Sequence, residues 1–413
     1  MSVSILDRGA AALTPLERCV GDADAFLADA WGRRAAMRVA APEGPAARTE
    51  GFTDLLTLDD VDRFLTTQAL RTPAFRLVIA GEKVAESAYT RSGRMGSRDV
   101  AGIADPSKVA TLFAGGATIV LQGLHRWSEP VARFIRDLEL QLGHPCQVNA
   151  YVTPPGAQGL DLHADPHDVF VLQAFGRKRW EIHAAPGEAA SGERPALDVE
   201  VGPSDTIYMP TGTPHAAAAQ EVASGHLTVG VHVTPWRDVL GDTWQALAAD
   251  PALAGSVPAG WTGDLDGFTA ELATRLELLA ASLRDGLDAR AVAERRLERF
   301  RSTRAQLARG TIAERAVPLA IDDDTELVRR PDSICELRLH GRDDTLIALL
   351  GDRRLEMPAR LEPAMRFVAE TAGTDEETDG FRVGELPLPD AASRAVLARR
   401  LVREGLLARR VRA

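Results

Sequence analysis

The amino-acid sequence predicts a mainly β protein with additional α-helices, arranged in three parts. Between residues 149 and 235, short runs of branched and aromatic residues are bounded by Gly and Pro, which is typical of strands and turns. From Trp236 onward Ala, Leu, Arg and Glu dominate, and apolar residues recur at helical spacing. From about Thr311, short strand-like runs are followed by helical patterns. We therefore expect three domains, at residues 1–235, 236–310 and 311–413.

Length and composition define the broad class of protein. The 413 residues exceed what one core usually holds, and 45% hydrophobic with 26% charged residues is typical of a soluble globular protein. The N-terminus shows no basic segment followed by an apolar core, and no apolar run approaches a membrane span, so we expect a cytoplasmic protein without membrane contact. The net charge of -11 argues against nucleic-acid binding by the whole surface and favours a basic peptide or protein as partner.

The segment that precedes the β-rich stretch contains short elements of both kinds. Residues 13–31 predict short helical pieces. Residues 57–78, TLDDVDRFLTTQALRTPAFRLV, predict a helix capped by Thr and Asp and then a strand. Residues 89–102 are polar and contain Gly. We expect a loop there, which is long enough to act as a mobile lid, although a plain solvated loop explains the same pattern.

The stretch NAYVTPPGAQGLDLHADPHDVFVLQAFGRKRW, residues 149–180, carries the strongest chemical signal. His163 and Asp165 are two residues apart, so in an extended segment their side chains point to the same face in a chelating geometry. A second imidazole from a distant strand would complete a site with two histidines and one carboxylate. Such a site suits Fe(II), because it leaves positions open for a co-substrate and dioxygen. His215, in the loop TGTPH, is the candidate for this third ligand.

A lysine follows the motif in an apolar setting. DVFVLQ, which begins at Asp168, predicts a buried strand, and a turn at 175–177 leads into KRWEIH as the returning strand. On that strand Lys178, Trp180 and Ile182 share one face. A lone ammonium among apolar neighbours is costly unless an anion neutralises it, and a dicarboxylate bound to the iron would supply that anion. The alternative is a solvated charge on an edge strand.

These residues resemble the motifs of a known family. NAYVTPPGAQGLDLHAD, DVFVLQAFGRKRW, DTIYMPTGTPHAA and GHLTVGV are similar to segments of the JmjC-type cupin oxygenases of the ribosomal oxygenase group. The upstream segment Gly115–Pro145 also resembles the strand and helix that precede the barrel core in that group. The group consists of Fe(II)- and 2-oxoglutarate-dependent protein hydroxylases. The resemblance is strong over roughly the first half of the chain and extends elsewhere to architecture only.

The resemblance implies a double-stranded β-helix barrel of the cupin type. It implies that His163, Asp165 and His215 are the iron ligands and that Lys178 binds the distal carboxylate of 2-oxoglutarate. Dioxygen takes the remaining position on the metal, and no catalytic side chain is implied beyond the metal centre. The implied substrate is an amino-acid side chain in a ribosomal or other protein.

Further residues are expected near the same pocket. Asn149 and Tyr151 match family positions that line the co-substrate pocket. His226, in SGHLT, lies on a strand that should border the pocket, where it either lines the site without binding metal or packs elsewhere. Trp180 and Phe170 are expected to be core residues.

The middle part predicts a helical face that must be covered. In the long run from Leu265 to Arg304, five apolar residues recur at spacings of three and four: Phe268, Leu272, Leu276, Leu279 and Leu283. This face packs either on its own barrel or on the same helix of a second subunit. The resemblance favours the second arrangement, because ribosomal oxygenases carry a helical dimerisation region here, and it implies a homodimer.

The last part predicts strands and helices of a small module. ICELRLHG and TLIALLGD predict two strands, ARLEPAMRFVAETAG at residues 359–373 predicts a helix, and DAASRAVLARRLVREGLLARR predicts another. The family carries a winged-helix-like module in this place. A winged helix usually suggests DNA binding, but balanced charges, with DEETD at 375–379, favour contact with protein or a structural role.

Three functions are compatible with these observations. The first is hydroxylation of a residue in a ribosomal or other protein. The second is the same chemistry on a peptide or small molecule in a biosynthetic pathway. The third is a non-catalytic cupin used for binding, against which the complete ligand set and Lys178 argue.

Overall fold

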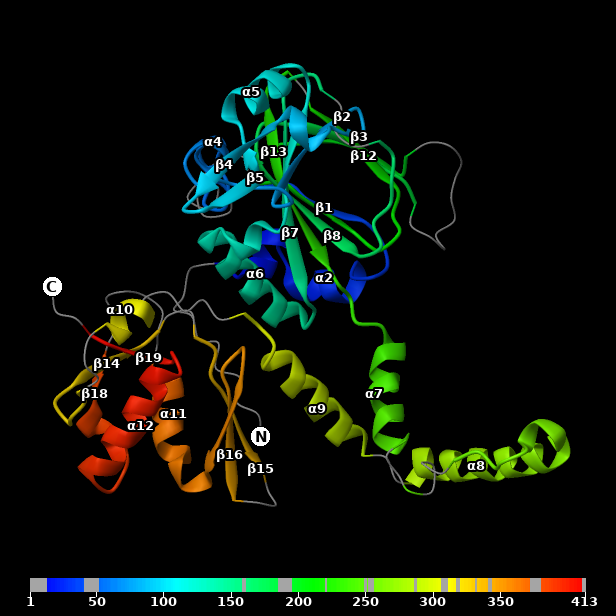
Figure 1. The fold of residues 1–413 in the computed structure, drawn as a ribbon, viewed down its shortest axis with the longest axis vertical. Coiled ribbons are helices and arrows are strands. Elements are labelled where there is room, and N and C mark those ends of the chain that lie inside the picture. The colour runs from blue at the N-terminus through cyan, green and yellow to red at the C-terminus, as the bar shows by residue number, and fades with distance from the viewer. Residues whose placement is uncertain are drawn as a thin grey trace. The chain divides into compact units, whose positions relative to one another are not determined.

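The chain folds into two compact units. The computed structural model describes residues 13–40, 52–157, 161–184, 195–219, 221–248, 251, 256–285, 288–305, 311–316, 320–330, 333–340, 344–371 and 380–410. The two units divide between Val233 and Thr234 (Figure 1). Among the described residues, no helix combines the length and the apolar character that crossing a membrane requires.

Two facing antiparallel sheets form the barrel of the first unit. The larger sheet has eight strands in this order: β1 Ala36–Arg38, β11 Thr206–Met209, β8 Asp168–Phe175, β13 Ser224–Val231, β7 Cys146–Thr153, β6 Thr118–Leu121, β2 Phe75–Ile79 and β3 Glu82–Lys83. The smaller sheet has three: β10 Leu197–Val201, β9 Lys178–Ile182 and β12 His215–Ala219. Strands from β8 to β13 are distributed over both sheets, so the expected double-stranded β-helix barrel is confirmed.

Strand β8 is buried on both faces, which explains its continuous apolar run. Phe170 and Leu172 belong to the core on the outer face of the large sheet, whereas Val169 and Val171 belong to a cluster between the sheets. The first set is covered by helices and the second faces the smaller sheet. A strand whose two faces are both buried against apolar side chains does not alternate between polar and apolar residues.

The expected hairpin between β8 and β9 is wrong. β8 pairs with β11 and β13, whereas β9 pairs with β10 and β12 in the other sheet. The turn at Gly176 carries the chain from one sheet to the other. Gly176 has a φ of +63°, and an added Cβ would lie 2.1 Å from the Ala223 carbonyl oxygen, so only glycine fits this crossing. β9 still turns Lys178, Trp180 and Ile182 inward, as predicted.

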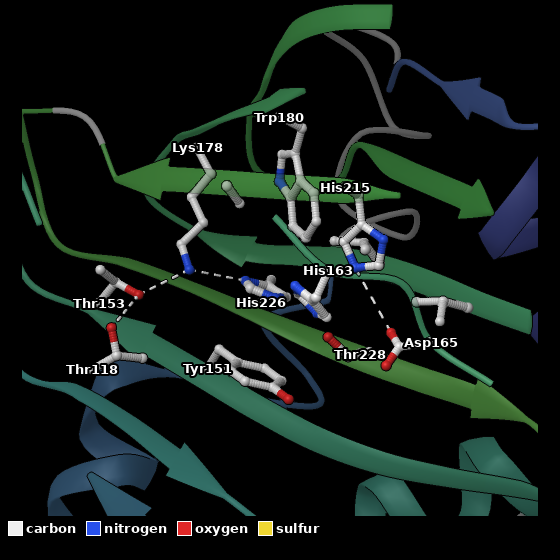
Figure 2. A pocket seen from close by; sticks show the side chains of 13 residues that line it. Thr118, Tyr151, Thr153, His163, Asp165, Lys178, Trp180, His215, His226 and Thr228 are labelled. Carbon is white, nitrogen blue, oxygen red and sulfur yellow. Dashed lines mark hydrogen bonds and ion pairs between the residues drawn. The ribbon is translucent and has the colours of Figure 1, made fainter. Parts of the chain in front are cut away.

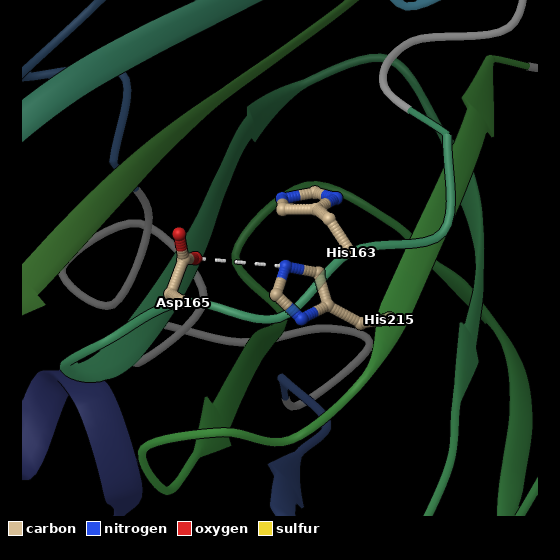
Figure 3. A group of neighbouring side chains, drawn as sticks. All are labelled: His163, Asp165 and His215. Atoms are coloured by element: carbon tan, nitrogen blue, oxygen red, sulfur yellow. Dashed lines mark ion pairs between the residues drawn. The ribbon is translucent and has the colours of Figure 1, made fainter.

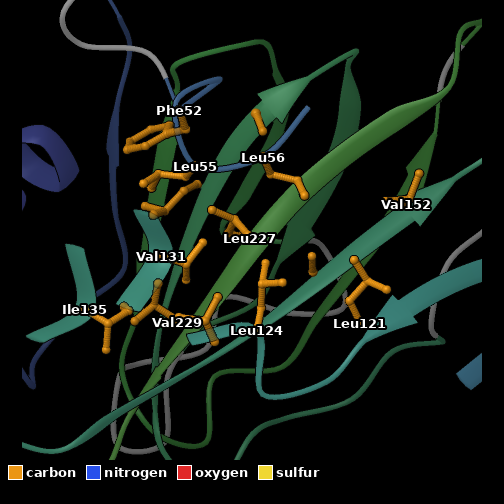
Figure 4. Close-up of a cluster of buried hydrophobic side chains, with 14 of the residues drawn as sticks. Phe52, Leu55, Leu56, Leu121, Leu124, Val131, Ile135, Val152, Leu227 and Val229 are labelled. Carbon is orange, nitrogen blue, oxygen red and sulfur yellow. The ribbon is translucent and has the colours of Figure 1, made fainter. Parts of the chain in front are cut away.

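Helices cover the outer face of the large sheet and complete the main core (Figures 1 and 4). These are α1 Pro15–Val20, α2 Ala23–Asp29, α4 Leu58–Thr66, α5 Pro106–Ala114 and α6 Glu129–Leu142. The predicted helix after Thr57 is confirmed, because Thr57 and Asp60 form a capping box at its start. Phe52, Val131 and Leu227 are examples of buried core residues, each of which contributes about 1.5–3 kcal/mol by leaving water. This core supports the sheet from the side opposite the site.

Residues 89–102 do not form the expected loop. They lie largely in a two-stranded hairpin of β4 Thr90–Met95 and β5 Arg98–Ala104. Gly96, with a φ of +60°, stands in the turn between the strands. β4 is polar and largely exposed, and the apolar residues of β5 are consecutive, so neither strand shows the alternation that marks a half-buried strand in sequence.

The second unit begins with three helices. They are α7 Trp236–Ala248, α8 Leu265–Asp285 and α9 Ala289–Arg301. The run from Leu265 to Arg304 is therefore two helices and not one, and α9 begins at the N-cap Asp288, whose carboxylate accepts hydrogen bonds from two backbone amides. Leu272, Leu276 and Leu283 on the predicted face of α8 are 45%, 54% and 48% exposed.

The remainder of the second unit combines small sheets with helices. One sheet consists of β18 Phe381–Arg382, β14 Glu326–Arg329 and β19 Leu407–Arg409, and the other of β15 Glu336–His340, β16 Thr345–Leu349 and β17 Arg354–Pro358. The helices are α10 Thr311–Arg315, α11 Glu362–Glu370 and α12 Ala391–Arg403. The predicted last helix is too long, because the chain turns at Gly405, with a φ of +81°, into β19. The acidic run 375–379 lies outside the described residues.

Candidate metal centre

His163 and His215 are held face to face by backbone pairing. The His163 amide donates to the His215 carbonyl at 3.1 Å, and the His215 amide donates to the His163 carbonyl at 2.8 Å. This isolated antiparallel bridge joins the extended segment before β8 to the start of β12. The two imidazole centroids lie 4.4 Å apart. Pairing across 52 residues therefore places both side chains over the same point.

Asp165 completes a cluster with the two histidines (Figure 3). Its Oδ2 lies 3.7 Å from His215 Nε2, and the ligand atoms of the three residues all lie within 4.8 Å of one another. The Gly212 amide donates to the Asp165 carbonyl at 2.9 Å, so the loop before His215 also fixes the backbone that carries Asp165. The three predicted residues thus come together, and their role as metal ligands remains a prediction.

The hydrogen bonds of both imidazoles leave one nitrogen free for a metal. His163 Nδ1 donates to the Asp161 carbonyl at 2.7 Å, and His215 Nδ1 donates to the Thr213 carbonyl at 2.9 Å. A carbonyl only accepts, so the proton sits on Nδ1 and the lone pair on Nε2. Burial also lowers the pKa of His215, which favours its neutral form. The donor set therefore fits a divalent transition metal, with orienting partners already in place.

A buried carboxylate joins the two loops that carry the cluster. Asp168 is 3% exposed and accepts hydrogen bonds from Tyr208 Oη at 2.5 Å and from the amide and hydroxyl of Thr211 at 2.8 and 2.7 Å. Tyr208 Oη itself accepts from the Gly32 amide at 2.7 Å. Asp168 follows Asp165 by three residues, and Thr211 precedes His215 by four. The sequence did not reveal this role, because Asp168 looks like one more acidic residue beside the motif.

The cluster opens into a pocket between the two sheets (Figure 2). The pocket encloses about 470 Å³, including its open mouth, which suits a small molecule. Figure 2 shows the cluster toward one end and Lys178 toward the other. Threonines, apolar side chains and aromatic rings form its walls, among them Thr118, Thr153, Val171, Trp180 and Thr228.

Lys178 is a buried ammonium with two neutral partners. Its side chain is 2% exposed, and Nζ donates to Thr153 Oγ1 at 2.9 Å and lies 3.2 Å from His226 Nδ1. Burial lowers the pKa of Lys178 to about 7. Burial, followed by the charge of Lys178, holds the pKa of His226 well below its usual range, so His226 is neutral and its Nδ1 accepts. No carboxylate among the described residues forms an ion pair with Lys178, and it is not a solvated surface charge.

The remaining predicted pocket residues differ in position. Tyr151 lines the pocket and stacks on His226, with ring centroids 5.2 Å apart. His226 also lines the pocket without joining the metal cluster. Asn149 stands beside Tyr151 on β7, where its Oδ1 accepts from the Gly123 amide at 3.0 Å and its amide group interacts with the Tyr151 hydroxyl. Arg76, which the sequence did not single out, interacts with the same hydroxyl.

The fold and the cluster together resemble those of cupins of the JmjC type. Residues 126–239 match the JmjC domain family, so this stretch forms a JmjC domain. The chain is 32% identical to ribosomal oxygenase 2 from Bos taurus over 190 residues, which are 42% of this chain and 40% of that protein. The resemblance to the ribosomal oxygenase group is thereby confirmed.

Two further similar proteins are one sequence relative and one solved structure. The bifunctional lysine-specific demethylase and histidyl-hydroxylase NO66 from Branchiostoma floridae is 33% identical over 157 residues, which are 38% of this chain and 24% of that protein. The structure of YcfD, a ribosomal oxygenase from Escherichia coli in complex with cobalt and 2-oxoglutarate, is 17% identical, with a TM-score of 0.48 over 94% of this chain and 98% of that one. The alignments span less than half the length of the curated relatives.

Replacement of Asp168 tests its part in holding the site. Asp168→Ala leaves the Thr211 amide and two hydroxyl groups without their acceptor, and a buried unsatisfied donor costs about 1–3 kcal/mol. We expect a fall of about 3 kcal/mol or more in the free energy of unfolding, measured by urea denaturation. The matched control, Asp198→Ala, removes an exposed carboxylate that pairs with Arg179 and should leave stability nearly unchanged. Similar stabilities for both variants would contradict the assignment.

Proposed function

We propose that this protein is an Fe(II)- and 2-oxoglutarate-dependent oxygenase that hydroxylates an amino-acid side chain of a ribosomal protein. The observation that carries the proposal is the pairing of two features in one pocket. One is a cluster of two imidazoles and a carboxylate with both Nδ1 atoms already engaged. The other is a buried lysine without an acidic partner among the described residues. The JmjC match and the names of the relatives support the same activity.

His163, Asp165 and His215 would hold Fe(II) from one side and leave its other positions open. When bound, the iron supplies oxidative decarboxylation of 2-oxoglutarate coupled to insertion of one oxygen atom of O2 into a substrate C–H bond. The second oxygen atom is retained in succinate, and carbon dioxide leaves. The chain's own part is to hold the ligand nitrogens in their neutral form, orient the co-substrate and restrict water.

Lys178 would bind the distal carboxylate of 2-oxoglutarate at the inner end of the pocket. A carboxylate there supplies the counter-charge that the buried ammonium lacks, and the resulting hydrogen bond is charge-assisted. Tyr151 would line the same pocket, with Asn149 beside it on β7 and in contact with its hydroxyl. The pocket provides one cation at one end and a metal cluster at the other, which is the arrangement that a 2-oxo dicarboxylate requires.

We also propose that the protein is a homodimer formed through α8. Leu272, Leu276 and Leu283 are about half exposed on one side of the helix, and Leu279 lies between them on the same side. A row of exposed leucines on a 21-residue helix is typical of a subunit contact. Residues 236–310 would then be the dimerisation region.

For residues 311–413 we propose a winged-helix-like module that contacts protein. The described part of this stretch contains three helices and two three-stranded sheets, which support this interpretation, although the strands β14, β17 and β19 were not predicted. Basic and acidic side chains are paired across its surface, as in Arg394 with Asp323 and Arg409 with Glu314. Such pairing leaves little excess positive charge for nucleic acid.

A cytoplasmic location and the first domain boundary at residue 235 also remain proposals.

Mass spectrometry of ribosomal proteins tests the activity. In cells that lack the gene, one ribosomal protein should lose the form that is heavier by the mass of one oxygen atom. The wild-type gene should restore this form. Asp165→Ala and His163→Ala should not restore it, because each removes one of three ligands and the purified variants should lose Fe(II) while they stay folded. Asp198→Ala is the control that should restore the modification. Undiminished iron in either ligand variant, or an unchanged ribosomal protein pattern, would contradict the proposal.

The pH dependence of 2-oxoglutarate binding tests Lys178. Because burial lowers its pKa to about 7 in the ligand-free protein, Lys178 is mainly charged below pH 7 and mainly neutral above it. The dicarboxylate favours the charged form, so affinity should be constant below pH 7 and fall by up to about tenfold per pH unit above it, with proton uptake on binding. The measurement is calorimetric titration of manganese-loaded protein without oxygen, from pH 6.5 to 9.

Two variants control for other effects of pH. Lys178→Ala should bind 2-oxoglutarate at least tens-fold more weakly, without the fall above pH 7, and keep its affinity for manganese. Lys178→Arg should retain part of the affinity and also lose the pH dependence, because arginine stays charged. Equal affinities for wild type and Lys178→Ala would assign the carboxylate to another residue.

The oligomeric state tests the proposed dimer. Leu276→Asp with Leu279→Asp places two charges on the proposed contact and should give monomers or insoluble protein, as measured by light scattering after gel filtration. Thr274→Asp with Ala281→Asp is the matched control, since these exposed positions lie on the opposite side of α8 and should leave the dimer intact. A monomeric wild-type protein at micromolar concentration would refute the proposal.

A further inference from the structure

Trp180 stands in the wall of the pocket between the metal cluster and Lys178. It is 4% exposed and shares the inward face of β9 with Lys178. Its ring centroid lies 5.3 Å from that of His226 at an interplanar angle of 75°, and 6.0 Å from that of His215. The indole therefore borders the space that a molecule reaching from the metal cluster to Lys178 would occupy.

The indole N–H of Trp180 is a buried donor without an acceptor. Nε1 is buried and has no hydrogen-bond partner in the described part of the chain. An indole nitrogen only donates, and a buried donor that makes no bond is destabilising, so such groups usually find a partner. Trp127 shows the ordinary case, since its Nε1 donates to the Gln122 carbonyl at 3.3 Å. Figure 2 shows the Trp180 nitrogen on the ring edge turned toward Lys178.

Lys178 has one N–H left for a ligand at the same place. An ammonium group has three donors. Two of those of Lys178 are directed to Thr153 Oγ1 and His226 Nδ1, and the third has no partner among the described residues. The pocket thus offers two uncommitted donors at its inner end, one charged and one neutral. Both come from positions i and i+2 of a single strand, so their side chains lie next to each other.

We infer that Trp180 and Lys178 together form a two-donor site for the distal carboxylate of the co-substrate, with the indole N–H bonded to one oxygen and the ammonium to the other. This inference rests on the proposed function and assigns Trp180, expected from sequence to be a core residue, a binding role. A carboxylate has two acceptor oxygens, so two donors fix its orientation where one ammonium fixes only its position. The ligand-free pocket leaves a donor unpaired, so a 2-oxo acid without a distal carboxylate is strongly disfavoured.

Two ligands and one substitution separate this role from packing. Trp180→Phe keeps an aromatic ring but removes the N–H. We expect manganese-loaded Trp180→Phe to bind 2-oxoglutarate about tenfold more weakly or worse, because a hydrogen bond to a charged group is lost. Binding of 2-oxopentanoate, which has the same chain length and no distal carboxylate, should not change. Trp127→Phe is the matched control and should alter neither affinity, since its N–H is bonded outside the pocket.

A second measurement is made on the wild-type protein, so it does not depend on whether a variant folds. In the zinc-loaded wild-type protein labelled with nitrogen-15, each of the six tryptophans contributes one indole N–H signal. The Trp180 signal is expected to shift downfield and its proton to exchange more slowly with 2-oxoglutarate, but not with 2-oxopentanoate. Its assignment follows from the signal that Trp180→Phe lacks, or otherwise from the signal broadened when manganese replaces zinc.

The outcomes distinguish the inference from the proposed function. Equal losses for both ligands in Trp180→Phe, with no indole shift, would mean that Trp180 acts by packing and would overturn the inference. If 2-oxoglutarate binds in a manner that depends on Lys178 but not on Trp180, the inference fails while the proposed function stands. If the wild-type protein binds no 2-oxoglutarate at all, both fail together.

Discussion

The reciprocal backbone hydrogen bonds between His163 and His215 are the constraint on which the candidate site depends. These two bonds join a segment before β8 to the start of β12, which belong to different sheets. Each histidine then uses Nδ1 to bond a carbonyl two residues before it, Asp161 or Thr213, so the same short stretch of backbone places the ring and selects its tautomer. The buried carboxylate of Asp168 connects these stretches a second time through Thr211. The barrel therefore holds the three side chains of the cluster in place without a metal. Their arrangement depends on the whole barrel and not on a single loop.

The same barrel must also offset the free-energy cost of burying polar side chains at the inner end of the pocket, where some donors have no partner. Lys178, His226, Thr153 and Thr118 are all buried, and the hydroxyl groups of the two threonines lie 3.1 Å apart, so the inner end of the pocket is a polar network inside an apolar shell. Such a network is stable only where the surrounding structure is rigid. The large sheet supplies that rigidity, because its opposite face is packed under α1, α2, α4 and α6. Folding and ligand recognition thus use opposite faces of one sheet.

How much of this the sequence could predict depends on whether the information is local. His163 and Asp165 were predicted to converge because a spacing of two in an extended chain is enough, and Lys178 was predicted to point inward because KRWEI alternates. Other features depend on contacts between distant residues. The crossing from β8 to β9 depends on the conformation of Gly176 and the approach of Ala223, and the role of Asp168 depends on Tyr208 and Thr211, about forty residues later. The hairpin at 90–104 was missed because neither of its strands alternates between polar and apolar residues. The unpaired Trp180 nitrogen depends on the packing of its neighbours, which no sequence pattern encodes.

Strand register also sets the length of the molecule that fits between the two ends of the pocket. His215 is paired with Ile182, and Ala219 with Lys178, so the lysine lies four residues along β9 from the metal-side histidine. Four residues of a strand span about 13 Å, and this is the separation along β9 between the lysine and the residue paired with His215. A lysine at position 180 would halve the separation along the strand, whereas one at position 179 would point away from the pocket. Trp180 occupies the intermediate position, beside the ligand and within the same face, and this placement allows one strand to supply a charge at the end of the pocket and a hydrogen-bond donor along its wall.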